Sequence, residues 1–470
     1  MSAPATTEKK YLKWYQKLAY GSGDLASNCS YGLVSSFVLL YLTGTLGLDS
    51  AIIGSLMLAS KVLDGISDVI FGTLIDRTHS KLGKARPWML FGQVGVSLCL
   101  FLLFAIPAGS TTMQYIYFFI VYTALNAVFY TANGIAYSSL VALITKNNNE
   151  RVQLGSFRFM FAVVTNIFMG FAVTGMVEKF GSGAAGWRTT ALIFAIVGLV
   201  VNTISCLAVK ELPEEELGDN TSEAAEEGKA VAEEKKHGFA ETAKILVHNK
   251  YYLMILAIYI VYYIMSNLTT GAGVFCATYY WGDGSLLGQF SMMKMFPVII
   301  ALAIAPVLIK KTGSMQKVNF WGYAISSVLG IPMIYFAMQK NLSMFLLFMF
   351  IKGIFAGTLS GSLNALIAEA SGYTTRTTGI HMDGMMYSCS SLGVKVGGGI
   401  GTAAVGWLLK LGGFVGTATV QSESAIRMIF NLYITFPFVI GIIITVLLAF
   451  LDVEKANKKW DAEHQKEAQA

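Results

Sequence analysis

The sequence is poor in charged residues. Only 13% of its 470 residues are Asp, Glu, Lys or Arg, and 54% are hydrophobic, whereas a soluble globular domain carries about 25% charged residues. A chain of this composition has a large surface that does not meet bulk water. One membrane-crossing helix needs about 20 apolar residues. The predicted fold class is therefore an all-α membrane protein with about a dozen spans.

The sequence also lacks the motifs of common enzymes. It contains no Walker loop, no Gly-x-Ser-x-Gly elbow and no His-Glu-x-x-His pair, so neither an ATP-driven pump nor a hydrolase is expected. Its five cysteines lie in apolar stretches and match no zinc site. No basic patch with interleaved aromatics indicates a nucleic-acid partner. We predict a protein that is not an enzyme, needs no cofactor and uses an ion gradient.

Apolar runs separated by polar or Pro/Gly breaks predict twelve spans in two halves of six. The spans cover residues 20–46, 51–76, 87–107, 113–145, 152–178, 187–209, 250–278, 286–309, 317–338, 342–370, 379–410 and 426–451. The predicted domains are an N-terminal segment 1–19, a first half 20–209, a linker 210–249, a second half 250–451 and a tail 452–470. The linker is rich in Glu, Ala and Lys, as expected of a tether, although a regulatory role stays open.

The basic residues predict the orientation. With a cytoplasmic N-terminus, 24 of the 34 Lys and Arg residues fall in inside segments and 5 in outside loops and span ends. Cytoplasmic loops of membrane proteins carry an excess of Lys and Arg. We therefore expect a multi-pass protein of the cell membrane, with both termini in the cytoplasm and the lipid bilayer as its surroundings.

The two halves show a weak internal repeat. The loop after the second span reads Gly72-Thr-Leu-Ile-Asp-Arg-Thr-His-Ser-Lys81, and the loop after the eighth reads Pro306-Val-Leu-Ile-Lys-Lys-Thr-Gly-Ser-Met315. Both loops are short and basic. Two repeated halves are a known transporter plan, in which the substrate binds near the midplane between them.

The second span carries the most informative charges. Asp64 and Asp68 are four residues apart and lie on one helix face, with Ser67 beside Asp68. A charge at mid-membrane costs at least about 2.5–3.5 kcal/mol on insertion scales, so such residues are expected to have a function or a charged partner. Two carboxylates and a hydroxyl suit a hard cation, and repulsion between the carboxylates favours holding a proton. The alternative is a structural ion pair with Lys61, although one lysine cannot neutralise both aspartates.

The first span places polar groups among aromatic rings. Asp24 and Asn28 are four residues apart, and Tyr20 and Tyr31 lie near the same face. This combination suits a polyhydroxylated ligand, because amides and carboxylates bind hydroxyls while ring faces cover the C–H side of a sugar. The alternative is that Asp24 caps or packs near the cytoplasmic end.

The fourth span repeats this mixture in the stretch Tyr130–Ser138. Thr131 could give an oxygen to the cation, and the pair Asn133-Gly134 suggests a local break in the helix. Hydrogen bonding between helices is the alternative explanation of these polar residues. In the fifth span, Arg158 either pairs with Asp24 or meets an anionic or hydroxyl-rich ligand.

Further lysines lie in the second half. Lys395 precedes three glycines in the eleventh span, as expected of a lysine that faces a water-filled cavity. Lys294 and Lys352 lie nearer predicted span ends, where a lysine can extend toward the interface.

Several motifs resemble the glycoside–pentoside–hexuronide cation symporter family, the group of the melibiose carrier within the major facilitator fold. They are Lys17-Leu-Ala-Tyr-Gly-Ser-Gly-Asp24, Asp64-x-x-Ser67-Asp68, Gly83-Lys-Ala-Arg-Pro-Trp88, Phe157-Arg158-Phe159, Thr378-Gly-Ile380 through Tyr387-Ser388, and Val394-Lys395. The resemblance covers both halves. It implies a cation site, holding Na⁺ or a proton, at Asp64, Ser67, Asp68 and Thr131, with Asp64 and Asp68 as the metal ligands if sodium is used.

The sugar site of that family is less well reproduced. Two of its aspartates align with Asn28 and Gly134, whereas its arginine and lysine are kept as Arg158 and Lys395. The pocket is therefore less acidic, which leads to the hypothesis of a different glycoside, with an acidic one such as a uronide among the candidates. The predicted substrate-binding residues are Asp24, Asn28, Tyr31, Tyr130, Asn133, Arg158, Ser391 and Lys395.

The predicted function is thus symport of a sugar or glycoside with Na⁺ or H⁺, by a protein that acts as a monomer. Two alternatives stay open. One is a cation-coupled carrier of a lysolipid-like amphipathic solute, and the other is a membrane sensor that does not transport.

Overall fold

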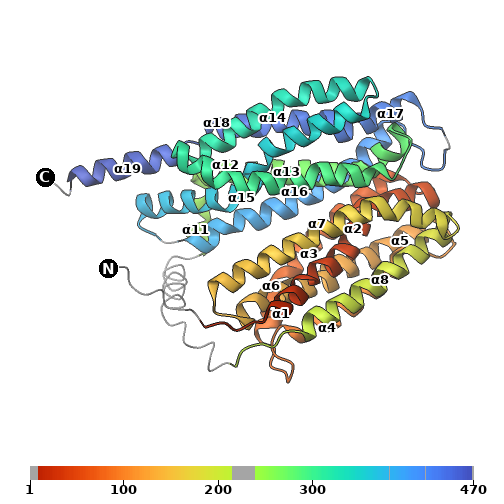
Figure 1. Cartoon of the computed structure of the whole chain (residues 1–470), viewed down its shortest axis with the longest axis horizontal. Coiled ribbons are helices and arrows are strands. Elements are labelled where there is room, and N and C mark those ends of the chain that lie inside the picture. The colour runs from red at the N-terminus through yellow and green to blue at the C-terminus, as the bar shows by residue number, and fades with distance from the viewer. Residues whose placement is uncertain (1–8, 214–238, 381, 419, 468–470) are drawn as a thin grey trace. The chain divides into compact units, whose positions relative to one another are not determined.

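The computed structural model describes residues 9–213, 239–380, 382–418 and 420–467, which are mostly helical (Figure 1). No strand occurs in these ranges. The chain forms two compact units. The first contains described residues of Met1–Asp219, Ala277–Gly288 and Gly406–Ala425, and the second those of Asn220–Cys276, Gln289–Val405 and Ile426–Ala470. The domain limits expected from the sequence stay a prediction.

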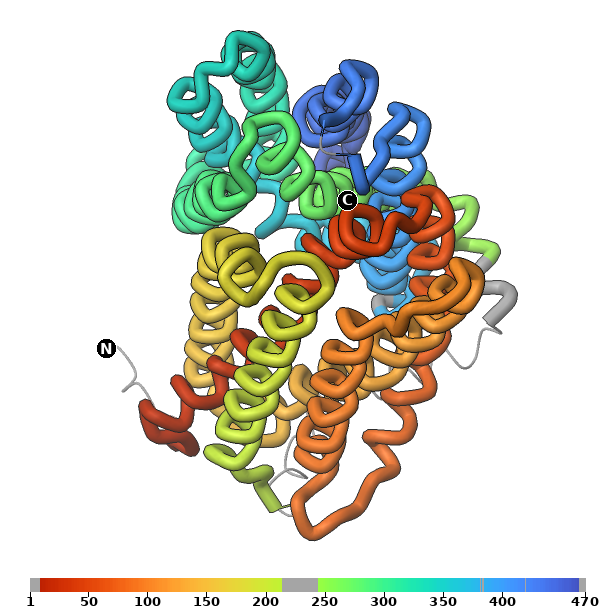
Figure 2. The backbone as a smooth tube through the Cα atoms, turned by 90° about the vertical axis from the view of Figure 1, so that its right-hand side faces the viewer, coloured from red at the N-terminus to blue at the C-terminus, as the bar shows by residue number. Residues whose placement is uncertain are grey.

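The first unit is a bundle of long helices that lie side by side, coloured red to yellow-green in Figure 2. Its helices are α1 (Trp14–Gly21), α2 (Gly23–Leu40), η1 (Tyr41–Thr45), α3 (Ser50–Asp76), α4 (Arg86–Leu103), α5 (Thr111–Thr123), η2 (Ala124–Tyr130), α6 (Thr131–Ile144), α7 (Asn148–Lys179) and α8 (Gly183–Leu207). The segments written η are π-helical and continue the α-helices that precede them.

The rest of the chain, mostly in the second unit, is also helical. Its helices are α11 (Phe239–His248), α12 (Lys250–Phe275), η3 (Cys276–Tyr280), α13 (Leu286–Thr312), α14 (Met315–Met338), α15 (Leu342–Thr378), α16 (Asp383–Leu411), α17 (Glu423–Phe430), η4 (Asn431–Thr435), α18 (Phe436–Phe450) and α19 (Val453–Glu467). Within this unit α14 packs against α15 and α18, and α12 packs against α18.

Eleven helical segments of the described chain are long and apolar enough to cross a membrane. The helix α3 has a similar length but carries Lys61, Asp64 and Asp68 near its middle. The number of twelve spans therefore stays a prediction, while the protein is a multi-pass membrane protein. Large apolar side chains point outward, as with Val69 at 73% and Phe91 at 71% exposure, because lipid rather than water is expected to cover them.

Helix ends differ from the expected ones where no strong breaker is present. The tenth span was expected to end at residue 370, but α15 continues to Thr378. It stops at Gly379, whose φ of 72° lies in the left-handed region that favours glycine. The residues after 452 also form a helix, α19. Asn457 of α19 donates to Glu369 of α15 at 2.9 Å.

In each unit, a glutamate carboxylate caps the N-terminal end of a helix. The helix is α4 in the first unit and α14 in the second. Just after α8, Glu211 accepts hydrogen bonds from the backbone N–H groups of Lys84, Ala85 and Arg86 at 2.7–3.0 Å. Just after α18, Glu454 accepts from the backbone of Gln316 at 2.9 Å and from the hydroxyl of Ser314. The first N–H groups of a helix lack partners within it, and their positive end attracts an anion. These contacts lie at or just beyond the ends of the two repeated stretches, residues 72–81 and 306–315.

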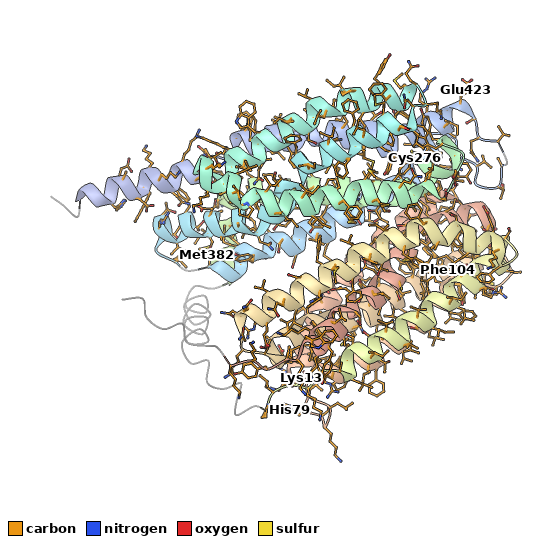
Figure 3. All side chains as sticks on the ribbon, viewed as in Figure 1. Lys13, His79, Phe104, Cys276, Met382 and Glu423 are labelled. Carbon is orange, nitrogen blue, oxygen red and sulfur yellow. The ribbon has the colours of Figure 1, made fainter. Side chains whose placement is uncertain are left out.

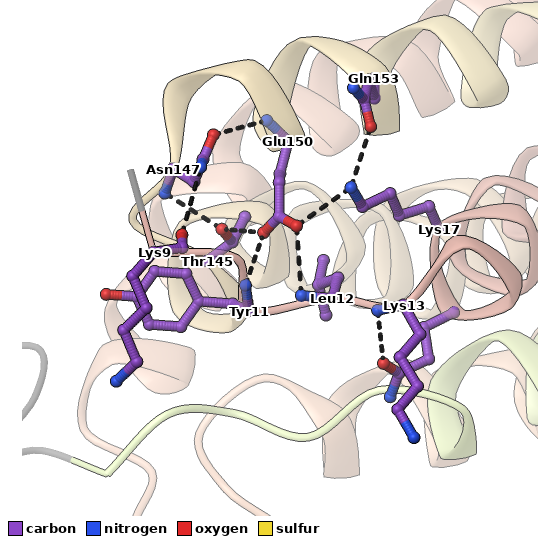
Figure 4. Close-up of polar contacts among 10 residues, drawn as sticks. Lys9, Tyr11, Leu12, Lys13, Lys17, Thr145, Asn147, Glu150 and Gln153 are labelled. Carbon is purple, nitrogen blue, oxygen red and sulfur yellow. Dashed lines mark hydrogen bonds and ion pairs between the residues drawn. The ribbon is translucent and has the colours of Figure 1, made fainter. Parts of the chain in front are cut away.

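A buried glutamate fixes the N-terminal segment to α7 (Figure 4). Glu150 is 2% exposed. It accepts hydrogen bonds from the backbone of Tyr11 and Leu12 and from the hydroxyl of Thr145, and it pairs with Lys17 at 3.0 Å. Lys13 of this segment and His79 of the loop after α3 lie at the same end of the first unit (Figure 3).

Candidate cation and substrate site

The centre of the candidate site is a contact between α3 and α6. The hydroxyl of Thr131 donates a hydrogen bond of 2.7 Å to Asp64 Oδ1, and both residues are 6% exposed. On the other oxygen, Asp64 Oδ2 lies 3.6 Å from Lys61 Nζ. The predicted neighbours Asp64 and Thr131 are therefore together. The ion pair between Lys61 and Asp64, which the sequence left open as an alternative, is also present.

A π-helical segment gives Thr131 its position. The residue follows η2 directly, and its hydroxyl also lies 2.9 Å from the carbonyl oxygen of Asn126, five residues earlier. Short π-helical stretches interrupt α-helices frequently at functional sites. The sequence instead suggested a break at Asn133-Gly134. That expectation is wrong, because α6 runs unbroken through both residues.

The other predicted cation ligands lie one turn along α3. Ser67 donates to the carbonyl oxygen of Asp64 at 2.9 Å, and Ser67 and Asp68 are both half-buried. No group of three or more His, Cys, Asp or Glu side chains suited to a metal occurs among the described residues. A cation here would therefore combine two carboxylates with hydroxyl, carbonyl or water oxygens, which is the chemistry of a hard cation.

Beside this cluster, α2 and α7 are joined by an ion pair. Arg158 Nε donates to Asp24 Oδ2 at 2.6 Å, and their side chains are 25% and 18% exposed. The guanidinium also lies over the ring of Tyr137, 4.2 Å from its centroid. Asp24 lies in the first turn of α2, which begins after a one-residue interruption at Ser22. The pairing of Arg158 with Asp24, one of two alternatives from the sequence, is thus formed.

The amide of Asn28 lies one turn beyond Asp24 and makes two hydrogen bonds. Asn28 Nδ2 donates to the carbonyl oxygen of Asp24 at 2.7 Å, and Asn28 Oδ1 accepts from Asn166 Nδ2 at 2.9 Å. Asn166 was not predicted as a site residue. Its distance of eight residues from Arg158 places both on one face of α7, and this spacing could have revealed it.

Two tyrosines connect the polar face of α2 with the cation cluster. The rings of Tyr31 and Tyr130 stack with their centroids 5.6 Å apart. Lys61, which pairs with Asp64, lies 5.8 Å from the centroid of the Tyr31 ring. Both tyrosines are half-buried, so ring surface remains for a ligand. Tyr31, Lys61 and Asp64 therefore form one continuous series of contacts.

Asn133 has a different role from the predicted one. It is 2% exposed and donates to the carbonyl oxygen of Met89 at 2.7 Å, with Asn202 Oδ1 3.4 Å away. The residue thus links α6 to α4 and α8 by hydrogen bonds, the alternative that the sequence left open. Its contacts do not support an assignment to the substrate site.

Ser391 and Lys395 lie in the second unit, one turn apart on α16. Ser391 is exposed and Lys395 is half-buried. Gly393, Gly397 and Gly401 of α16 face α12: a Cβ on Gly397 would lie 2.4 Å from the carbonyl oxygen of Ile260. These glycines therefore serve close helix packing, and Lys395 projects from the other side of α16.

Comparison with known proteins identifies the family. Residues 19–455 match the family described as MFS/sugar transport protein. The chain belongs to this family. It is therefore a membrane transporter and not an enzyme, and the family resemblance found in its motifs is confirmed.

Three curated relatives match nearly the whole chain. The isoprimeverose transporter of Lactiplantibacillus pentosus is 26% identical, covering 100% of this chain and 96% of the relative. The putative glycoside/cation symporter YagG of Escherichia coli (strain K12) is 24% identical, covering 95% and 93%. The glucuronide carrier protein homolog of the same bacterium is 23% identical, covering 86% and 85%.

Solved structures share the fold. A bacterial homolog of the human lysosomal transporter Spinster, in an inward-facing and unoccupied conformation, superimposes with a TM-score of 0.69 at 13% identity, covering 95% of this chain and 98% of that one. A D-xylose–proton symporter gives a TM-score of 0.64 at 12% identity, covering 94% and 98%. The predicted major facilitator fold is thereby confirmed.

Proposed function

We propose that this protein moves a sugar or glycoside into the cell together with Na⁺ or H⁺. The observation that carries the proposal is the buried contact between Asp64 and Thr131, which is joined through Lys61 to the aromatic face at Tyr31. A carboxylate in a membrane span is costly unless it is paired or used. Here Asp64 is paired with Lys61 at 3.6 Å, and its oxygen atoms together with those of Asp68 suit a bound cation.

The chemistry of this cluster supports the binding of a cation. Asp64, Ser67, Asp68 and Thr131 supply only oxygen atoms, which suit Na⁺, and a carboxylate pair can also exchange a proton. Cation binding would offset the negative charge of Asp64 and Asp68 on α3 and so raise the affinity for the sugar. Linkage requires that the sugar raise the affinity for the cation by the same factor.

The cargo is supported by the face that Asp24, Asn28, Tyr31, Tyr130 and Arg158 form. Tyrosine rings suit the C–H faces of a sugar, and amide and ionic groups suit its hydroxyls. Relatives named for isoprimeverose and for glucuronides favour a glycoside. An acidic glycoside such as a uronide is supported by the relative named for glucuronides. It is also supported by the loss of two of the family's aspartates while Arg158 and Lys395 are retained.

We place the protein in the cell membrane as a monomer, with both termini in the cytoplasm. Transport would proceed by alternating access, in which the site opens to one side of the membrane at a time. The excess of Lys and Arg in the predicted inside segments supports this orientation.

The test is uptake by purified protein in liposomes, with Na⁺ and pH varied independently and a panel of neutral and acidic glycosides as cargo. Asp68→Asn should abolish cation-driven accumulation while leaving exchange or downhill flux. Asp76→Asn, at the exposed end of the same helix, is the matched control and should behave as the wild type. Undiminished uphill uptake by Asp68→Asn would refute the cation site. Uptake of a lysolipid but of no glycoside would refute the cargo.

A further inference from the structure

The second unit contains a cavity of its own, with a volume of about 190 Å³. Residues of α12, α13, α14, α15 and α18 line it, together with Tyr433 of η4, and most of its wall is apolar, as with Met293, Phe345 and Pro437. Two lysines, Lys294 of α13 and Lys352 of α15, also line it. No Asp or Glu is among the described residues of this wall.

Close packing of α13 and α15 places the backbones of the two lysines near each other. A Cβ built on Gly353 would lie 2.8 Å from Pro297 Cβ and 3.6 Å from the carbonyl oxygen of Met293. Gly353 follows Lys352 directly, and Met293 precedes Lys294. The two lysines therefore start from neighbouring points of the contact between α13 and α15.

The lysines have little to offset their charge. Lys294 Nζ lies 3.2 Å from the hydroxyl of Thr269 and 3.4 Å from that of Thr270, and each hydroxyl also bonds a backbone carbonyl of α12. Within the described chain no carboxylate lies within 4 Å of the ammonium of Lys294 or Lys352. Both side chains are half-buried and lie eight and ten residues inside their helices. They are therefore too deep for the position near a span end that the sequence suggested.

Charge balance decides what such a cavity can hold. Two ammonium groups in a small, mostly apolar space repel each other and lose much of their hydration. An anion would offset both charges, and a hydroxyl such as that of Ser266, which also lines the wall, can donate to it. In the first unit, by contrast, the cations Arg158 and Lys61 already lie 2.6 Å and 3.6 Å from carboxylates.

We propose that this cavity is an anion-binding site. It takes the carboxylate or sulfonate group of a small organic molecule, with Lys294 and Lys352 as the cations and the apolar wall around the rest of the ligand. If its ligand is an effector, the site goes beyond the proposed symport; if its ligand is the cargo, the site rests on that proposed function and adds a binding site for the acidic group. Its ligand is either an acidic cargo or a separate acidic effector, and both carry the same group.

The first experiment measures binding to the purified full-length protein by titration calorimetry. The probes are glucuronate and its neutral counterpart methyl glucoside. Lys294→Gln and Lys352→Gln should each weaken glucuronate binding about tenfold or more, because each removes a charge-assisted hydrogen bond. Lys310→Gln, on the exposed end of α13, is the matched control and should bind glucuronate as the wild type does. Melting temperatures verify that the variants are folded.

The results separate this site from the proposed function. Equal glucuronate affinity in the wild type, Lys294→Gln and Lys352→Gln would overturn the anion site, as would a wild type that binds methyl glucoside but not glucuronate. Neither result touches the cation-coupled uptake of neutral glycosides, which depends on Asp64 and Asp68.

Transport assays then separate the two sources of the anion. If the anion belongs to the cargo, Lys352→Gln raises the half-saturating concentration for glucuronide uptake about tenfold and leaves neutral uptake unchanged. If it is an effector, glucuronate changes neutral uptake by the wild type but not by Lys352→Gln. Either result supports the site. Identical behaviour of the two proteins in both assays contradicts it.

Discussion

Arg158 on α7 and Asp24 on α2 form a direct ion pair of 2.6 Å within the first unit. Removing one partner leaves a half-buried charge, so Asp24→Asn and Arg158→Gln should each lower the free energy of unfolding by about 1–3 kcal/mol. The double variant should lose about 1–2 kcal/mol less than the sum, because neither charge is then stranded. Chemical unfolding in detergent measures all three. Additive losses would mean that the pair contributes nothing.

The hydroxyl of Thr131 should set the affinity for the coupling cation. Thr131→Val keeps the side-chain volume but removes the hydrogen bond to Asp64. The variant also removes an oxygen atom that would bind the cation, so the half-saturating cation concentration for uptake should rise about tenfold or more. Thr131→Ser keeps the hydroxyl and should remain near the wild type. The same cation dependence in all three proteins would remove Thr131 from the site.

The carboxylates of Glu211 and Glu454 should each stabilise the helix start that they contact. Glu211→Gln and Glu454→Gln weaken several charge-assisted hydrogen bonds. Each should lower the free energy of unfolding by about 1–3 kcal/mol. The control is Glu178→Gln, at an exposed position near the end of α7, which should change it by less than about 0.5 kcal/mol. Losses no larger than that of the control would contradict a capping role.

Asp49 should give the protein a pH-dependent stability on the acid side. Burial alone would raise the pKa of Asp49, but hydrogen bonds from Lys410, Ala51 and Ile52 outweigh burial and lower the pKa below 3.8. A group with a lowered folded-state pKa stabilises the protein above its unfolded pKa, and this stability is lost as pH falls through the folded value.

The corresponding experiment compares melting temperatures of the wild type and Asp49→Asn from pH 6 to pH 3. The wild type should melt higher at pH 6, and the difference should shrink as the pH falls below about 4. Asp76→Asn serves as the control at an exposed carboxylate. A difference that stays constant over the whole range would contradict the role of the Asp49 charge.

Patterns along the chain predicted well the features that depend on local spacing. The long helices follow from apolar runs, and Asp64 and Asp68 share a face because they are four residues apart. The polar stretch of the fourth span suggested that Thr131 could give an oxygen to a cation, and the family resemblance assigned it to one site with Asp64. No spacing within the second or fourth span indicates which residues of other helices they contact.

Contacts between helices escaped prediction where several polar residues compete. Tyr130, Thr131 and Asn133 lie within four residues of one another, directly at the end of η2, and of these Asn133 donates to the carbonyl oxygen of Met89. Asn166 was missed because a single amide in an apolar stretch gives little signal. Lys352 was assigned to a span end, since the cavity beside it exists only once five helices have packed.

The caps by Glu211 and Glu454 also bear on the order in which the chain is made. Glu211 follows α8 and Glu454 follows α18, yet each closes a helix that left the ribosome more than 100 residues earlier. Until residue 211 emerges, the start of α4 has unsatisfied N–H groups, and the same holds for α14 until residue 454. The start of each of these two helices is thus completed only by a residue that lies far along the chain.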